Sequence, residues 1–239
     1  MTTRCYVSDP FWEQPEIVLN PEASHHIARV LRMGPGEALE VFDGRGRVAS
    51  TELVHVAKQS VTVRVVSHQE VPVPRPRITL LQSLIKTPSM DLVIRKATEL
   101  GVSVIQPVHN MHCVVRSKER PERWQKIVVS AAEQCGANWM PTVHPVCSWE
   151  TALTNVSSDT PFIICSLNSK RPMRDVLRDL ENPEQLILAV GPEGDYSAEE
   201  ETAAQAAGAL SVSLGALTLR AETATIMALS ALRYEYGGI

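Results

Sequence analysis

The spacing of hydrophobic and polar positions changes along the chain. Up to about residue 70, short apolar runs alternate with polar residues in a period of two, which is typical of half-buried strands, and 60–66 is the clearest example. Residues 41–48 place Asp43-Gly44 between two apolar runs, which predicts a hairpin. A helical turn over 25–31 is expected to end at Gly34-Pro35-Gly36. The first part of the chain is therefore expected to be rich in β-structure.

A proline-rich segment, 71–76, separates this region from a different pattern, because alternating prolines stiffen a chain as linkers do. Beyond it, apolar runs alternate with stretches of helical period. The expected strands are 78–81, 102–108, 162–167, 186–190 and 211–214, and the expected helices start at Ser89, near Trp124, at Ser197 with Glu200 as a capping box, and at Glu222. Such alternation predicts an α/β domain with a mainly parallel sheet between helices. We expect two domains, 1–72 and 73–239.

The composition limits the class of protein to which the chain belongs but indicates no activity. A chain of 239 residues with 44% hydrophobic and 21% charged residues is typical of a globular protein that needs no disulfide for stability. The amino-terminal segment lacks the apolar core of a signal peptide, and no apolar stretch reaches membrane-spanning length. Five widely spaced cysteines, none in a C-x-x-C pair, predict free thiols in a reducing cytosol. We therefore expect a cytoplasmic protein that has no membrane partner.

Charge is distributed unevenly along the sequence. The net charge is −4, but residues 75–149 carry ten Lys and Arg against five Asp and Glu. The densest positive stretch contains Arg116, Lys118, Arg120, Arg123 and Lys126. Such a patch is able to contact nucleic-acid phosphates. A solvated face with charges at helix ends explains the same residues, and charge alone favours that simpler interpretation.

Two glycine-bearing loops follow predicted strands near the carboxyl terminus. Gly191-Pro192-Glu193-Gly194 follows 186–190, and Leu214-Gly215 leads toward the last helix. Glycines at this edge of an open α/β sheet let backbone groups approach a ligand. A tight turn between strand and helix also requires glycine, so each loop alone favours a structural interpretation. Two such loops on successive strands favour a ligand site. Phosphate-loop, G-x-G-x-x-G dinucleotide and G-x-S-x-G motifs are absent from the relevant positions.

The combination of motifs resembles the RsmE family of ribosomal RNA methyltransferases, and the resemblance runs nearly from end to end. The segments that carry it are 25–26, 30–32, 35–36, 42–44, 96–102, 123–124, 131–134, 188–194, 214–215 and 219–224. The resemblance implies a SPOUT-type knotted, mainly parallel sheet with helices on both faces, and a small PUA-like β-barrel at the amino terminus. It also implies a homodimer that methylates uracil N3 in 16S ribosomal RNA of the small ribosomal subunit.

The same resemblance implies site residues. S-adenosylmethionine is expected in loops formed by Leu167, Gly191, Pro192, Glu193, Gly194, Leu214, Gly215 and Leu219. RNA contacts are expected from Arg29, Arg32, Arg116, Lys118, Arg120 and Arg123. Methyl transfer from a sulfonium needs positioning and no metal, whereas uracil N3 must lose a proton. Arg220 is the expected electrostatic stabiliser and Glu222 the candidate base. A Glu at a helix start also complements the helix dipole, and Glu193 is similarly ambiguous.

Some residues depart from the family pattern or point elsewhere. Asp195 replaces a usual glycine, while Leu217 and Ala137 replace arginines, and 86–89 replaces a basic loop. These departures affect the expected RNA target more than the cofactor. The His109-x-x-His112-Cys113 pattern lacks a second ligand pair, so we expect no metal. The remaining alternatives are methylation of a different RNA, a non-catalytic RNA-binding or ribosome-assembly protein, and a cofactor-binding protein with another substrate.

Overall fold

The computed structural model describes residues 3–8, 14–115 and 121–237. The chain divides into two compact units. The first unit contains Met1–Val73 and Ala132–Met140, and the second contains Pro74–Ala131 and Pro141–Ile239. A segment distant in sequence therefore completes the first unit.

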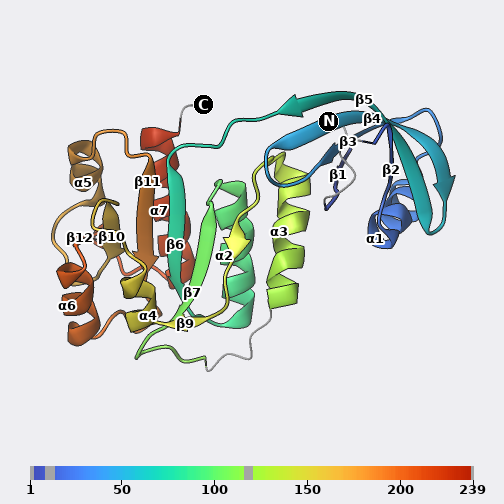
Figure 1. Cartoon of the computed structure of the whole chain (residues 1–239). Coiled ribbons are helices and arrows are strands. Elements are labelled where there is room, and N and C mark those ends of the chain that lie inside the picture. Colours follow the sequence, from blue (N-terminus) through green and yellow to red (C-terminus); the bar gives the residue numbers. More distant parts are fainter. Residues whose placement is uncertain (1–2, 9–13, 116–120, 238–239) are drawn as a thin grey trace. The chain divides into compact units, whose positions relative to one another are not determined.

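Among the described residues of the first unit, five strands are present. They are β1 (Arg4–Tyr6), β2 (Glu16–Val18), β3 (Ala38–Phe42), β4 (Arg47–Ala57) and β5 (Ser60–Glu70). They form one sheet in the order β1-β3-β4-β5-β2, in which β1 runs parallel to β3 and the other pairs are antiparallel. Figure 1 shows β4 and β5 as long curved strands. The predicted hairpin is confirmed, because Phe42 of β3 pairs with Val48 of β4.

The helical turn of the first unit has two parts. Helix α1 (Pro21–His25) continues into a short π-helix, η1 (His26–Leu31). The side chain of Asn20 accepts a hydrogen bond from the amide of Ala23 at 2.8 Å and caps the start. The expected end at Gly34 is wrong in detail. Arg32 itself takes a left-handed φ of 55° and stops the helix two residues earlier.

The segment Ala132–Met140 packs within the first unit through specific hydrogen bonds. The carboxylate of Glu133 accepts from the amide of Tyr6 at 3.0 Å, and the indole of Trp139 donates to the carbonyl of Val71 at 3.0 Å. Gly46 lies under the Trp139 ring with a φ of +95°, so a β-carbon there would clash with the ring at 2.6 Å. The turn between β3 and β4 therefore requires glycine at this position.

The second unit is an α/β domain. Its strands are β6 (Arg77–Ser83), β7 (Val104–His109), β8 (Thr142–Val143), β9 (Cys147–Ser148), β10 (Phe162–Cys165), β11 (Gln185–Val190) and β12 (Ala209–Val212). Its helices are α2 (Thr87–Glu99), α3 (Pro121–Cys135, which ends in the first unit's segment), α4 (Trp149–Thr154), α5 (Met173–Asp179), α6 (Ala198–Ala206) and α7 (Ala221–Tyr236). The sheet order is β12-β10-β11-β6-β7-β8, with β9 beside β7, and its strand pairs are parallel as expected.

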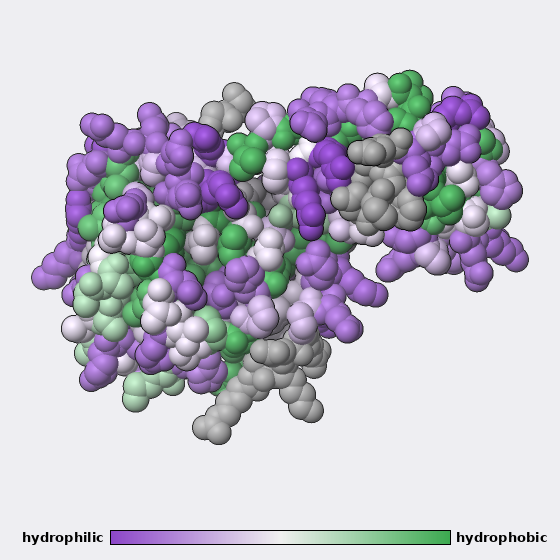
Figure 2. Space-filling model, viewed as in Figure 1, coloured by the Kyte–Doolittle hydropathy of each residue, from purple (hydrophilic) through white to green (hydrophobic). Residues whose placement is uncertain are grey.

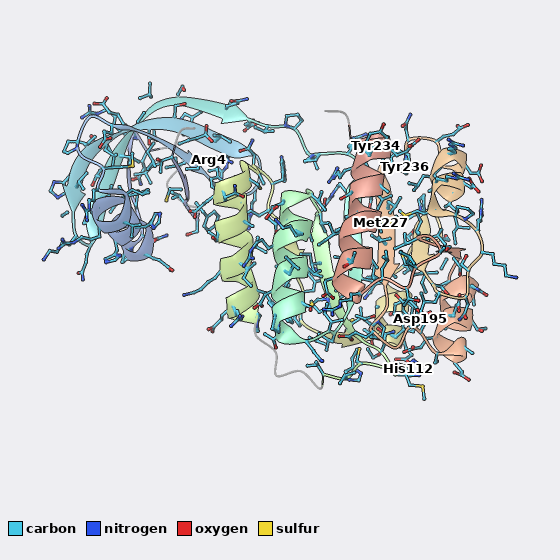
Figure 3. All side chains as sticks on the ribbon, turned by 180° about the vertical axis from the view of Figure 1, so that it is seen from behind. Arg4, His112, Asp195, Met227, Tyr234 and Tyr236 are labelled. Atoms are coloured by element: carbon cyan, nitrogen blue, oxygen red, sulfur yellow. The ribbon has the colours of Figure 1, made fainter. Side chains whose placement is uncertain are left out.

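Helices cover both faces of this sheet, because successive side chains of a strand point to opposite faces. On one face, Ile187 and Ala189 of β11 belong to a cluster with Trp149 of α4 and Ala204 of α6. Helix α7 packs against α2 and α5. Figure 1 shows α4 and α6 in front of the sheet, and Figure 3 shows α2 and α7 from behind. The prediction of a parallel sheet between helices is therefore confirmed.

The sequence predicted the start of α6 correctly, because a side chain caps this helix, whereas α2 has no side-chain cap and its start was misplaced. Ser197 and Glu200 form the expected capping box at α6. Ser89 is not the cap of α2, which begins at Thr87 after Lys86 and carries Pro88 in its first turn. Proline lacks an amide hydrogen and is well suited to that first turn. The expected helix start was therefore too late.

None of the described helices is both long and apolar enough to cross a membrane. On the face seen in Figure 2, hydrophilic side chains predominate and apolar side chains form only small patches. Many large apolar side chains are buried in the cores, as Trp149 and Phe162 illustrate.

Candidate functional site

Three loops meet in one pocket at the carboxyl ends of adjacent strands. β12, β10 and β11 are neighbours and parallel, so the chain segments that follow them emerge at the same edge of the sheet. The lining consists of 165–167, 190–193 with Asp195, 212–219, and Ala221 and Ala224 of α7. The cavity encloses about 190 Å³. Both glycine-bearing loops of the sequence contribute to it.

Glycine is required at specific positions around this pocket. A β-carbon on Gly191 would lie 3.0 Å from the ring of Tyr196, and one on Gly194 would lie 2.9 Å from the β-carbon of His112. Gly215 has a φ of +129°, which residues with side chains rarely adopt. The three glycines thus allow close packing behind the loops and an unusual turn at the pocket wall.

Asp195 connects three segments around the pocket. Its amide donates to the carbonyl of Pro192 at 3.0 Å, and its Oδ2 accepts from the amide of Leu167 at 3.0 Å. Its carbonyl lies 3.0 Å from Nδ1 of His112, and Figure 3 shows these two residues side by side. Its φ is 56°, in the left-handed region. Asp is among the few residues besides glycine that tolerate this conformation, because its side chain bonds locally.

The start of α6 is tied to the loop after β7 by one buried carboxylate. Glu200 is only 8% exposed. Its Oε1 accepts from the side-chain amide of Asn110 at 3.2 Å and from the amide of Met111 at 2.8 Å, and its Oε2 accepts from the amide of Ser197 at 3.0 Å. Because His112 follows directly, this carboxylate fixes the residue on which Gly194 packs.

The floor of the pocket is chemically inert. Burial raises the pKa of the Cys165 thiol to about 12, and the negative charge of Asp195 adds to the effect. Burial, followed by the neighbouring charges of Cys165 and Asp195, also raises the pKa of Tyr196. A thiol with such a pKa is almost entirely protonated at neutral pH and is a poor nucleophile. We therefore assign Cys165 a packing role.

Backbone groups in the outer wall of the pocket have no hydrogen-bond partner among the described residues. Within the described chain, no hydrogen bond uses a backbone group of 216–219. Helix α7 then begins at Arg220 without a side-chain cap. Helix starts expose amide hydrogens that need partners, from solvent or from a ligand. Leu217 is 79% exposed and Leu167 is 60% exposed, so both present apolar surface at the rim.

The structure brings together most of the residues expected to hold a cofactor. Those that line the pocket are Leu167, Gly191, Pro192, Glu193, Leu214, Gly215 and Leu219. Gly194 lies outside the lining and packs on His112. Sequence reasoning missed Ser166, Ser213 and Ala224, which also line the pocket. Small residues in a turn or a helix carry no signal in sequence, so only the fold reveals them.

The expected catalytic pair lies beside the pocket. Arg220 is exposed at the start of α7, and Glu222 is half-buried in its first turn. Neither lines the pocket, although Leu219 and Ala221 on either side of Arg220 do. Their chemical roles remain predictions.

The expected RNA contacts are distributed over separate places. Arg29 and Arg32 are exposed in and after η1 of the first unit. Arg116, Lys118 and Arg120 lie outside the described residues. In the second unit, Nε of Arg123 lies 3.1 Å from both carboxylate oxygens of Asp91, which is only 8% exposed. The guanidinium of Arg123 therefore pairs with Asp91, and the residue is nevertheless exposed to solvent.

A groove between α2 and α3 surrounds Arg123. Arg95, Lys126 and Ser130 line the same groove. Arg95 and Lys126 add two positive charges to that of Arg123. Together these three charges exceed the single negative charge of Asp91, which also lines the groove. The groove is therefore a positively charged surface, and the residues that form it come from the basic middle part of the sequence.

The histidine and cysteine pattern after β7 is used for packing in the structure. His112 contacts the carbonyl of Asp195, and the sulfur of Cys113 accepts from the amide of Asn110 at 3.3 Å. Among the described residues, no group of three or more His, Cys, Asp or Glu side chains is arranged to hold a metal ion.

Comparison with known proteins reveals the relationships of this chain. Residues 72–233 match the model of an RNA methyltransferase domain, and residues 19–66 match that of an RNA methyltransferase PUA domain. The ribosomal RNA small subunit methyltransferase E of Synechocystis sp. is 34% identical over 219 residues, which cover 90% of this chain and 71% of the relative. The chain belongs to the ribosomal RNA small subunit methyltransferase E family. The Bacillus subtilis member is 28% identical and covers 93% of this chain and 91% of its own.

Solved structures agree with membership of the methyltransferase E family. The Neisseria gonorrhoeae member, bound to S-adenosyl methionine, aligns with a TM-score of 0.90 and 33% identity, over 99% of this chain and 98% of its own. A methyltransferase from Legionella pneumophila in complex with the same cofactor has a TM-score of 0.87 and 34% identity, over 98% of both chains. The expected SPOUT architecture with its trefoil knot fits this family, as does a PUA-like first unit.

Proposed function

We propose that this protein transfers a methyl group from S-adenosylmethionine to N3 of a specific uracil in 16S ribosomal RNA of the small subunit. In this proposal residues 73–239 form the catalytic domain and residues 1–72 form an RNA-binding domain, and the protein works in the cytoplasm as a homodimer. The observation that carries it is the pocket, which is built from the three loops that the sequence predicted for the cofactor.

The residues of the pocket suit S-adenosylmethionine. Its wall offers unpaired backbone groups over 216–219 for a polar nucleoside, and several leucines and Pro192 for the flat faces of an adenine. Glycine at 191 and 194 keeps the loop close to the protein behind it, where a β-carbon would force it away. The bound cofactor supplies an activated methyl group on a positively charged sulfur.

The groups of this chain then have two tasks in the reaction. Uracil N3 must give its proton to a base and form a bond to the methyl carbon, while the carbon–sulfur bond breaks and its electron pair stays on sulfur. Glu193 in the pocket lining and Glu222 in the first turn of α7 are two carboxylates that we assign as candidates for the proton. Arg220, exposed at the same helix start, stabilises the negative charge that develops on a uracil oxygen.

Two positively charged places support an RNA substrate. The groove of Arg95, Arg123 and Lys126 in the second unit is able to contact phosphates, and Arg29 and Arg32 of the first unit are exposed. The match of residues 19–66 to an RNA methyltransferase PUA domain supports the same assignment for the first unit. Phosphate contacts of this kind orient an RNA and leave the choice of base to the pocket.

The homodimer is supported by an apolar surface on α7. Met227 is 46% exposed and Tyr234 is 88% exposed, and both line a groove with Met173 and Leu177 of α5. Figure 3 labels Met227 and Tyr234 on this helix. Leu214 and Gly215 belong to this groove as well as to the cofactor pocket, so a second copy bound here would also enclose the pocket.

The experiment that tests the function is transfer of labelled methyl groups from S-adenosylmethionine to small ribosomal subunits that lack uracil N3 methylation. Label found at a single N3-methyluridine supports the proposal. Label at another nucleotide or in another RNA overturns the proposed target and keeps the chemistry. If calorimetry shows that the cofactor binds but no label is transferred, the RNA target is a different one. Asp195, Leu217 and Ala137 are then the positions at which to look for the change in RNA recognition. Neither binding nor transfer favours a non-catalytic RNA-binding protein.

The role of Arg220 has its own test. Replacing it in Arg220→Ala removes the guanidinium beside the pocket without removing a side-chain cap or a buried contact. We expect turnover to fall by about a hundredfold or more, because one electrostatic donor in an active site has this weight. Thermal unfolding and cofactor affinity should stay as in the native protein. Near-normal turnover would remove Arg220 from the mechanism.

A further inference from the structure

The charged side chains that line the cofactor pocket have one sign. Among the described residues that line it, Glu193 and Asp195 are the charged ones, and neither Lys, Arg nor His contributes. Glu193 is exposed to solvent, whereas Asp195 is half-buried. A half-buried charge is screened less by water and salt than an exposed one, so Asp195 dominates the field inside the cavity.

The carboxylate of Asp195 is held at the pocket by the loops. Oδ2 is fixed by the amide of Leu167 at 3.0 Å. Oδ1 lies over Gly191, 3.4 Å from the place where a β-carbon would stand, and accepts no hydrogen bond from a described residue. The left-handed φ of 56° at Asp195 costs free energy that an ordinary glycine would not incur. One oxygen of a positioned carboxylate in the pocket lining is therefore left without a hydrogen-bond donor among the described residues.

We propose that Asp195 makes the pocket selective for the charge of the methyl donor, so that it binds the sulfonium cofactor more tightly than the neutral thioether product. This inference rests on the proposed function. S-Adenosylmethionine carries one positive charge more than S-adenosylhomocysteine, and the two otherwise differ by the methyl group alone. A negative field acts on that difference, whereas hydrogen bonds to the adenosine part act equally on both molecules.

The same charge affects the chemical step in the opposite direction. The positive charge on sulfur disappears as the methyl group leaves, so a carboxylate stabilises the starting state more than the transition state. Asp195 therefore favours cofactor capture and product release at the cost of the rate of transfer. A residue that only shaped the loop would not strengthen cofactor binding and at the same time slow the transfer step.

Asp195→Asn isolates the charge. Asparagine tolerates a left-handed φ, and its side-chain oxygen is able to accept from the amide of Leu167 as Oδ2 does. Glu193→Gln removes the exposed carboxylate of the same lining, and Glu181→Gln removes an exposed carboxylate outside it. Affinities of the full chain and of these variants for S-adenosylmethionine and S-adenosylhomocysteine are measured by calorimetry at low and high salt, together with the single-turnover rate of methyl transfer.

We expect Asp195→Asn to weaken binding of S-adenosylmethionine by about tenfold, as one partly screened charge at close range would, and to leave S-adenosylhomocysteine unchanged. Its single-turnover rate should equal or exceed that of the native chain. Glu193→Gln should weaken binding of S-adenosylmethionine less than Asp195→Asn does, and Glu181→Gln should leave this affinity unchanged. Equal losses for both ligands, or no loss for either, would overturn the selectivity. If the native chain binds neither ligand, the proposed function itself fails.

Discussion

The cofactor pocket owes its shape to residues that have small side chains or unusual backbone angles. Gly194 packs against His112, Gly215 adopts a φ of +129°, and Asp195 occupies the left-handed region. Cys165 and Tyr196 behind them are buried and protonated at neutral pH, because burial raises the pKa of both. Backbone geometry therefore decides where a ligand fits, and the few charged side chains decide which ligand is preferred.

Gly194→Ala tests the backbone requirement. The new β-carbon would stand 2.9 Å from the β-carbon of His112, closer than such atoms approach in proteins, so the loop must move. We expect the Kd for S-adenosylmethionine to rise by about tenfold, a loss of about 1.4 kcal/mol, and we expect calorimetry to show it.

A second substitution separates crowding from other effects of the new methyl group. His112→Gly removes the opposing β-carbon, so the double variant should recover affinity relative to Gly194→Ala. Gly34→Ala is the matched control, because its β-carbon would meet nothing closer than 3.8 Å. Equal affinities of Gly194→Ala and the native chain would show that the loop moves freely.

The start of α6 and the loop after β7 form one connected structure. Glu200 is buried, caps its own helix through Ser197, and accepts hydrogen bonds from Asn110 and Met111. Buried carboxylates are stable only when such donors surround them. The capping box read from the sequence thus also positions His112, which belongs to a different segment.

Glu200→Gln is expected to destabilise the second unit by about 2 kcal/mol. The glutamine nitrogen is unable to accept a hydrogen bond, so at least one buried amide loses its charged partner. Urea unfolding should report a lower midpoint with an unchanged slope. Glu199→Gln, an exposed neighbour in the same first turn, should change the midpoint by a few tenths of a kcal/mol at most. Similar midpoints for the two variants would refute the role assigned to Glu200.

The chain combines an RNA methyltransferase domain with a PUA domain, and the proposed homodimer would add a second copy of each. The apolar residues on α7 lie close to the pocket, because Leu214 and Gly215 border both. Association through α7 would therefore bury exposed apolar surface and also complete the wall of the pocket. Assembly and catalysis would then depend on the same few residues.

Tyr234→Glu should weaken that association. A carboxylate buried in the proposed interface loses its solvation, and we expect the dimer dissociation constant to rise by at least about tenfold. Analytical ultracentrifugation measures it directly. Val66→Glu is the control, because this valine is also well exposed but lies on β5 of the first unit. A native chain that is monomeric at micromolar concentration, or a variant as dimeric as the native chain, would exclude α7 as the interface.

The sequence alone predicted the elements whose signals are local. The turn at Asp43-Gly44, the capping box at Ser197 and the alternation after residue 76 each depend on neighbours a few residues apart, and the structure confirms them. The start of α2 was misplaced because proline in a first turn and serine two residues later give competing signals. Such competition is settled by packing and not by local preference.

Only the tertiary structure decided which distant residues meet. The order β12-β10-β11 places three loops around one pocket, although they belong to segments that are far apart along the chain. Asp195 stood out in sequence as a departure from a pattern, and its contacts with Leu167 and His112 give that departure a physical meaning. The pairing of Arg123 with Asp91 was likewise invisible. Sequence patterns report the faces of single elements, whereas a site depends on sheet order and register, which long-range packing determines.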